Sequence, residues 1–176
     1  VVVPCDIIET KKATDFLLLK FVGPKYIRFA REATPIVTTP ATPFEFGKAN
    51  VIRLRRTDGN FVDAFDTVLA SAYGNEEEDL TIVACGPMVP EAMRAAFILK
   101  EEAGIEARII NMHTLKPIDG AAIIRAAKET GIIVTAEEHQ IGALAWPVSN
   151  IITASEDLYG HPVITGAIGV KDRFGD

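Results

Sequence analysis

The chain has 176 residues, of which 48% are hydrophobic and 24% are charged, and its mean hydropathy is +0.20. This composition is that of a globular protein able to bury a core, and the length suits one domain or one domain with part of another. The net charge of −6 disfavours binding to nucleic acid or to an anionic membrane, because both would be repelled. Small molecules and other proteins are the expected partners.

The sequence has no stretch as long as the roughly 20 apolar residues of a membrane span and no signal-like core, so we expect a cytoplasmic protein. Cys5 and Cys85 each end an apolar run, where a buried reduced thiol is the ordinary interpretation and a disulfide is not expected. The chain opens at Val1 without an initiator methionine. We therefore expect it to be part of a longer protein, or one of two subunits.

The first 30 residues predict a small α/β segment. An apolar, strand-like run ends at Val3, and Asp6 follows as the N-cap of a helix over residues 7–20. Gly23-Pro24 ends this helix, because proline cannot continue it. Residues 25–30 are aromatic and β-branched enough for a second strand.

Residues 32–47 alternate prolines with threonines, a pattern that excludes a helix and favours an extended linker. We place a domain boundary near Pro40. The expected organisation is a domain fragment over residues 1–39, a linker over residues 40–47 and a complete domain over residues 48–176.

The second domain is predicted to open with a strand over residues 49–55 and a turn at Asp58-Gly59. An amphipathic helix over residues 61–72 follows, because apolar residues recur there at helical spacing. Its apolar residues are Phe61, Phe65, Val68, Leu69 and Ala72. The acidic run at residues 76–79 is most simply a solvated loop.

Residues 80–136 predict a strand–helix–strand–helix–strand unit. Residues 80–84 are a short apolar run, as expected of a parallel strand covered on both faces. Helices after Pro90 and Asp119 lead to strands at residues 105–112 and 132–136, and two crossovers of this length imply parallel strands.

A last helix containing Pro147 is predicted to run to about Ala154, followed by a strand over residues 162–168 whose direction is left open, antiparallel pairing included. The predicted fold is a three-layer α/β sandwich with a mostly parallel sheet, preceded by a fragment of a second α/β domain.

Ligands of open parallel sheets bind beyond the carboxyl ends of the strands, which here carry Cys85-Gly86, His113-Thr114 and Glu137-Glu138-His139. A metal site from His113, His139 and a glutamate is weakly supported, because no local ligand pair accompanies the histidines. Gly86 stands alone among prolines, which excludes a dinucleotide fingerprint. We expect no catalytic, cofactor-binding or metal-binding residue in this chain.

Arg28 and Arg31 fall at the end of the predicted strand over residues 25–30. An arginine fork at a strand end can bind a phosphate or a carboxylate. A surface salt bridge is an equally good interpretation of this spacing.

Several motifs, taken in order, resemble the C-terminal domain of transketolases, and the first 31 residues resemble the end of the preceding pyrimidine-binding domain. The motifs are Val1-Val2-Val3-Pro4-Cys5-Asp6, Tyr26-Ile27-Arg28-Phe29-Ala30-Arg31, Thr81-Ile82-Val83-Ala84-Cys85-Gly86, Asn111-Met112-His113-Thr114-Leu115-Lys116-Pro117-Ile118-Asp119, Glu137-Glu138-His139 and Lys171-Asp172-Arg173-Phe174-Gly175. Residues 56–78 are longer than the turn usual there in this family.

The resemblance implies transfer of a two-carbon ketol unit between sugar phosphates, in an enzyme that uses thiamine diphosphate and Mg²⁺. It implies that Arg31 holds the substrate phosphate, that Arg28 supports it, and that the cofactor site lies in an upstream part or a companion subunit. A homodimer of the complete enzyme is expected, and the isolated chain should be inactive.

Two other interpretations remain open. The same portion of 1-deoxyxylulose-5-phosphate synthase, or of the β subunit of a 2-oxoacid dehydrogenase, shares this domain plan. A non-catalytic assembly or regulatory module would use the sheet domain only to associate.

Overall fold

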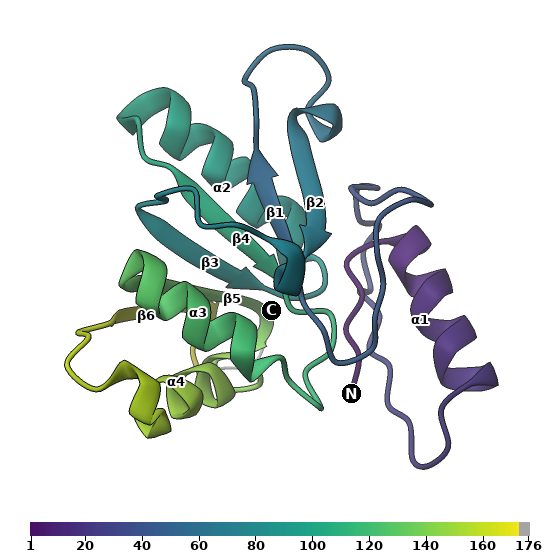
Figure 1. Cartoon of the computed structure of the whole chain (residues 1–176). Helices are drawn as coiled ribbons and strands as arrows, with labels where there is room; N and C mark the ends of the chain where they lie inside the picture. Colours follow the sequence, from purple (N-terminus) through teal and green to yellow (C-terminus); the bar gives the residue numbers. More distant parts are fainter. Residues whose placement is uncertain (173–176) are drawn as a thin grey trace.

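A computed structural model describes residues 1–172 and contains a six-stranded sheet in the order β2-β1-β4-β3-β5-β6 (Figure 1). The strands are β1 Asn50–Leu54, β2 Phe65–Leu69, β3 Leu80–Ala84, β4 Ala107–Asn111, β5 Ile132–Gln140 and β6 Ile164–Val170. The near-terminal motif at residues 171–175 lies partly outside the described residues.

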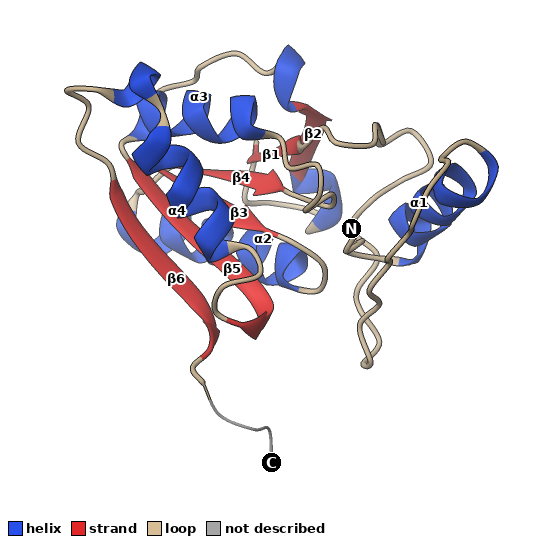
Figure 2. Cartoon of the chain, turned by 90° about the horizontal axis from the view of Figure 1, so that it is seen from below, coloured by secondary structure: helices blue, strands red, loops and turns tan. Residues whose placement is uncertain are grey.

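Helices cover both faces of this sheet, and the predicted three-layer α/β fold is confirmed (Figure 2). One face packs against α2, Met88–Ala103, and the other against α3, Gly120–Thr130, and α4, Ala145–Ala154. Helix α1, Ile7–Leu19, lies beside the sheet. No helix in residues 1–172 is long and apolar enough to cross a lipid bilayer.

The sheet is parallel across β4, β3, β5 and β6, and antiparallel where β1 pairs with β4 and β2. The pairing Ile132↔Ile164 makes the last strand parallel, so the antiparallel alternative is wrong. The connection from β5 to β6 passes through α4, as expected of a crossover between parallel strands.

The predicted helix over residues 61–72 is wrong, because these residues form β2 between two single 3₁₀ turns. Phe65, in register with Leu54, is buried, whereas Asp66 and Val68 are exposed, so the burial has the period of a strand. Phe61 packs against the Phe65 ring at 5.2 Å between centroids. Residues 56–78 therefore contain an edge strand of the sheet.

The predicted strands at residues 1–3 and 25–30 reduce to isolated bridges. Val2 pairs with Ile27 on one side and with Thr114 on the other, and no ladder extends from these pairs. Arg28 N–H donates to the Val2 carbonyl at 2.9 Å. These two isolated bridges connect residues 1–3 to the segment at Ile27 and to the loop after β4.

The first three residues lie across the carboxyl ends of β3 and β4. Val3 N–H donates to the His113 carbonyl at 2.8 Å, and the Val3 carbonyl accepts from Gly86 N–H at 3.1 Å. Gly86 has φ +56°, and a Cβ there would lie 2.8 Å from Val3 Cγ1. Glycine is required at this position both for its backbone conformation and for this close approach.

Gly86→Ala should therefore destabilise the chain more than Gly104→Ala. Both glycines have a left-handed backbone conformation, which destabilises an alanine at either position by about 1 kcal/mol. Only the Cβ at position 86 would also meet another atom, since nothing lies within 4 Å of a Cβ at position 104. We expect about 1–3 kcal/mol of additional loss for Gly86→Ala, measured by urea denaturation. Equal losses in the two variants would contradict the close contact with Val3.

Candidate functional site

The carboxyl end of β5 contains a β-bulge that re-aims the Glu137-Glu138-His139 motif. The register passes from Ala136↔Ile168 to Gln140↔Val170, so three residues of β5 face one residue of β6. Bulges of this kind bend a strand and turn side chains out of the sheet. The motif consequently leaves the sheet face and reaches the neighbouring loops.

Glu137 is buried and accepts hydrogen bonds from three backbone N–H groups. Its Oε1 accepts from Gly142 at 2.9 Å and Ala145 at 3.1 Å, and its Oε2 accepts from Leu144 at 2.8 Å. Leu144, the residue before α4, supplies no side-chain cap. The Glu137 carboxylate therefore caps the start of α4, where negative charge is favoured.

Arg28 connects the N-terminal segment to the same bulge. Its Nη2 donates to the Glu138 carbonyl at 2.5 Å and lies 3.5 Å from Glu138 Oε2. Both side chains keep part of their surface in solvent. The structural alternative left open by the sequence, an ion pair, is thus present for Arg28.

Arg31 is exposed, and its side chain makes no hydrogen bond or ion pair with any residue from 1 to 172. Its neighbours Phe29, Ala30 and Glu32 line a cavity of about 460 Å³ that also borders Asp6 at the start of α1. A phosphate role for Arg31 stays a prediction. A guanidinium with its donors unused is suited to it.

His113 and His139 do not share a metal site. His113 is buried, stacks on Phe44 with 4.5 Å between ring centroids, and places Nδ1 2.9 Å from Thr114 Oγ1. Burial lowers the pKa of His113 to about 4, so this ring is neutral at pH 7. His139 is exposed, and residues 1–172 contain no group of three His, Cys, Asp or Glu able to hold a metal.

Asp6 caps α1, as predicted, and also fastens the proline-rich segment. Its Oδ1 accepts from Glu9 N–H at 2.9 Å, and its Oδ2 accepts from the backbone N–H groups of Val37 and Thr38 at 2.9 and 2.6 Å. Residues 37 and 38, just before the predicted linker, are therefore held against the helix start by a buried carboxylate.

Glu9 is a buried carboxyl that sequence reasoning missed. Its Oε2 accepts from Cys5 N–H and its Oε1 from the Asn111 side-chain amide, both at 2.7 Å. Burial raises the pKa of Glu9, although these hydrogen bonds oppose the rise. The spacing of Asp6 and Glu9 matches a capping box, which is the signal that would have predicted a Glu9 side chain turned back toward the backbone before the helix, as in its bond to Cys5 N–H.

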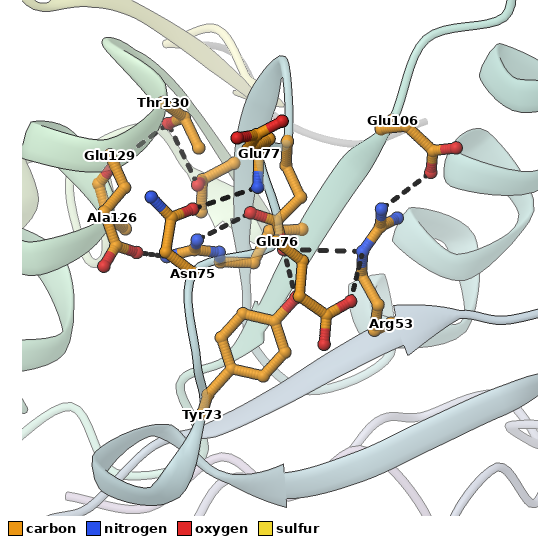
Figure 3. A network of polar contacts seen from close by, with 12 residues as sticks. Arg53, Tyr73, Asn75, Glu76, Glu77, Glu106, Ala126, Glu129 and Thr130 are labelled. Atoms are coloured by element: carbon orange, nitrogen blue, oxygen red, sulfur yellow. Dashed lines mark hydrogen bonds and ion pairs between the residues drawn. The ribbon is translucent and has the colours of Figure 1, made fainter.

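The acidic run at residues 76–79, predicted to be solvated, contains a buried ion pair at the opposite end of the sheet. Figure 3 shows the surrounding network, including Arg53, Tyr73 and Glu106. The buried Glu78 places Oε2 2.6 Å from Arg108 Nη2 and also accepts from the Tyr73 hydroxyl. Burial opposes ionisation of Glu78, but hydrogen bonds from Arg108 and Tyr73 lower its pKa overall. The prediction holds for the exposed Glu77 and is wrong for Glu78.

Arg108 is the centre of this network at the amino end of β4. Besides Glu78 it pairs with Glu129 of α3, and its guanidinium lies 4.9 Å from the centroid of the Tyr73 ring. Arg53 of β1 approaches Glu78 at 3.4 Å and pairs with Glu106 at 2.7 Å. These contacts join strands and a helix within the chain, so we assign the network a structural role.

The family model described as "Transketolase, C-terminal domain" matches residues 71–173. One of the subunits of the apulose-4-phosphate transketolase of Phocaeicola vulgatus is 36% identical over 175 residues, which are 98% of this chain and 46% of that protein. The 1-deoxy-D-xylulose-5-phosphate synthase of Heliobacterium modesticaldum is 41% identical over 138 residues, covering 76% of this chain and 21% of that protein.

A solved structure, described as a split gene transketolase in an inactive β4 tetramer, superposes with a TM-score of 0.73 at 34% identity. The match covers 99% of this chain and 49% of that one. The chain thus spans about half the length of the transketolase subunits that it matches.

The buried Glu9 makes a pH-dependent contribution to stability. Burial raises the pKa of the Glu9 carboxyl in the folded state. The protein is therefore less stable toward unfolding when pH rises from the unfolded-state pKa of this carboxyl through its folded-state pKa, because ionisation is easier in the unfolded chain. Glu9→Gln keeps an acceptor for Cys5 N–H and removes this ionisation. The variant should therefore gain stability relative to the wild type as pH rises from 4 to 7, measured by urea denaturation; a pH-independent difference would contradict this.

Arg108→Met should destabilise the chain by about 3–5 kcal/mol, because the buried Glu78 would lose its nearest cation, at 2.6 Å, and keep only the more distant Arg53 at 3.4 Å. Arg94→Met is the matched control, since Arg94 pairs with Glu91 at 2.7 Å on the surface, where such pairs contribute about 0–1 kcal/mol. Chemical denaturation measures both changes. Similar losses would show that the network is not what stabilises this end of the sheet.

Proposed function

Because this chain belongs to the family of transketolase C-terminal domains, we propose that it is the C-terminal part of a transketolase acting on sugar phosphates. The observation that carries the proposal is the match to a transketolase subunit over 98% of the chain, which includes the segment of Arg28 and Arg31. The complete enzyme would transfer a two-carbon ketol unit from one sugar phosphate to another.

In this proposal Arg31 binds the phosphate of the sugar, and Arg28 positions it. The exposed Arg31 guanidinium offers donors in a fork that matches a phosphate. Arg28 is fixed twice, by its backbone bond to Val2 and by its side-chain bond to the Glu138 carbonyl. The segment between the two arginines is therefore held at the carboxyl edge of the sheet, where ligands of such sheets bind.

We assign thiamine diphosphate and Mg²⁺ to the part of the enzyme that this chain does not cover. Residues 1–172 contain no group of three His, Cys, Asp or Glu side chains that could hold a metal ion. When bound in the complete enzyme, the cofactor supplies the carbon–carbon bond chemistry. The contribution of this chain is to bind and orient the substrate phosphate.

The companion part, in our proposal, docks on the face of residues 1–39, which we interpret as the end of a pyrimidine-binding domain joined by residues 40–47 to the domain at 48–176. Leu19 is 79% exposed and Val22 is 95% exposed. A cavity of about 550 Å³ lies beside them, lined in part by Leu17 and Phe21. Exposed apolar side chains around a hollow are typical of an interface.

We further propose that the chain associates with itself, as the expected homodimer requires. The related split transketolase is described as a β4 tetramer, which supports self-association of this kind of subunit. The alternative function, that of 1-deoxyxylulose-5-phosphate synthase, is supported by a higher identity over a smaller part of the chain. A purely non-catalytic assembly module would leave the exposed Arg31 without a role.

Arg31→Ala tests the proposed function in the enzyme reconstituted from this chain, a transketolase N-terminal section, thiamine diphosphate and Mg²⁺. The KM for a phosphorylated ketose should rise roughly 10- to 100-fold with little change in kcat, because one charge-assisted phosphate contact of about 1.5–3 kcal/mol is lost. Steady-state ketol transfer with phosphorylated and unphosphorylated sugars measures the effect.

Arg56→Ala, which removes another exposed arginine, is the matched control and should leave the KM unchanged. An unchanged KM in Arg31→Ala would contradict the proposal that Arg31 binds the substrate phosphate. Ketol transfer by the 176-residue chain alone, with cofactor added, would contradict the assignment of the cofactor site to a companion part.

A further inference from the structure

Strand β6 is an edge strand that residues 1–172 leave unpaired on one side. It pairs with β5 on one side, and no described residue pairs with its other side. Ile164, Ile168 and Val170 are 67%, 55% and 41% exposed. Figure 2 shows β6 at the margin of the sheet.

This edge lacks the features that normally prevent strands from pairing between molecules. Its seven residues, Ile-Thr-Gly-Ala-Ile-Gly-Val, include no charge and no proline. The opposite edge, β2, carries Asp66, which forms an ion pair with Arg55 at 2.8 Å. The two edges therefore differ, and only β6 is open to another strand.

The outward backbone groups of β6 can be identified from its bonds to β5. Ile164 N–H donates to the Gly131 carbonyl, and the Gly166 carbonyl accepts from Thr135 Oγ1. Because successive residues of a strand alternate, the N–H and C=O groups of Thr165, Ala167 and Gly169 point away from the sheet.

We propose that β6 pairs antiparallel with β6 of a second copy of this chain, about a two-fold axis at Ala167. In this register Ala167 lies opposite Ala167 of the second copy, and Thr165 lies opposite Gly169 of the second copy. The outward N–H and C=O groups of these residues then all form hydrogen-bonded pairs between the two strands. A two-fold axis requires antiparallel strands and self-complementary surfaces, and the outward residues meet both conditions. The inference rests on the proposed function, because it names the surface for the proposed self-association.

Side-chain sizes fit the same register. Gly166 and Val134 lie on the same face of the sheet, because a Cβ added at Gly166 would be 3.8 Å from Val134 Cγ2. Ile168, two residues later, lies on that face as well. Pairing sets Gly166 of one copy opposite Ile168 of the other. The glycine leaves room for the isoleucine, which is exposed in the single chain.

A second copy suits this edge better than a charged partner does. Each chain carries a net charge of −6, so contact between two copies costs least where the contacting surfaces carry no charge. The uncharged β6 is such a surface. The companion part is instead assigned the N-terminal face around Val22.

Sedimentation velocity of the 176-residue chain at about 50 µM tests the proposal. The wild type should sediment as a dimer or larger assembly, and Ile168→Asp should halve the mass, since it places a carboxylate in the paired edge. Val22→Asp, on the N-terminal face, is the control and should leave the mass unchanged. A monomeric wild type, or a mass halved by Val22→Asp and not by Ile168→Asp, would overturn the proposal.

A second variant does not depend on disrupting the strand. Ala167→Cys should give a covalent dimer with a short bismaleimide, because residues facing across an antiparallel pair have Cβ atoms about 5 Å apart. Ser71→Cys is the exposed control, and Cys5 and Cys85 are buried. No more cross-linking at Ala167→Cys than at Ser71→Cys would refute the register. Neither measurement uses enzymatic activity, so a failure of the proposed reaction is distinguished from a failure of the interface.

Discussion

The backbone of Val3, bonded on one side to the loop after β4 and on the other to the turn after β3, is the contact on which the carboxyl edge of the sheet depends. It requires Gly86, because any Cβ at that position would overlap the Val3 side chain. Through Val2 it also fixes the backbone of Arg28. A segment without regular strand pairing is thereby connected to the sheet by backbone hydrogen bonds.

The buried carboxyls beside this contact explain why α1 stays with the sheet. Asp6 binds the backbone of the proline-rich segment, and Glu9 binds the Asn111 amide at the end of β4. Each carboxyl satisfies buried donors that would otherwise cost about 1–3 kcal/mol apiece. The polar groups are therefore part of the packing between the N-terminal helix and the main domain.

The sequence predicted the unit from β3 to β5 because buried parallel strands form short apolar runs and its helix ends carry clear signals. Gly104 and Gly131 end α2 and α3 in the left-handed conformation, and Asp119 caps α3. The N-cap at Asp6 was predicted on the same basis. These features depend on residues close in sequence, so they could be predicted from periodicity and from helix-capping residues.

What the sequence did not predict depends on distant partners. The helical spacing of Phe61 and Phe65 also fits a strand between two turns, and only pairing with β1 decides the outcome. Glu78 is buried because Arg108, 30 positions later, reaches it. Of the candidate site, the sequence allowed a salt bridge for Arg28 but did not identify Glu138 as its partner, since the bulge that presents Glu138 appears only in the register.

The bulge in β5 also has an evolutionary consequence. Residues 137–139 of β5 lie opposite the single residue Gly169 of β6, and pairing resumes at Gln140. Side chains at positions 138 and 139 can thus be exchanged without shifting the strand that follows. A family that keeps the Glu137 cap can in this way vary the side chains beside Arg28 while inheriting an unchanged scaffold.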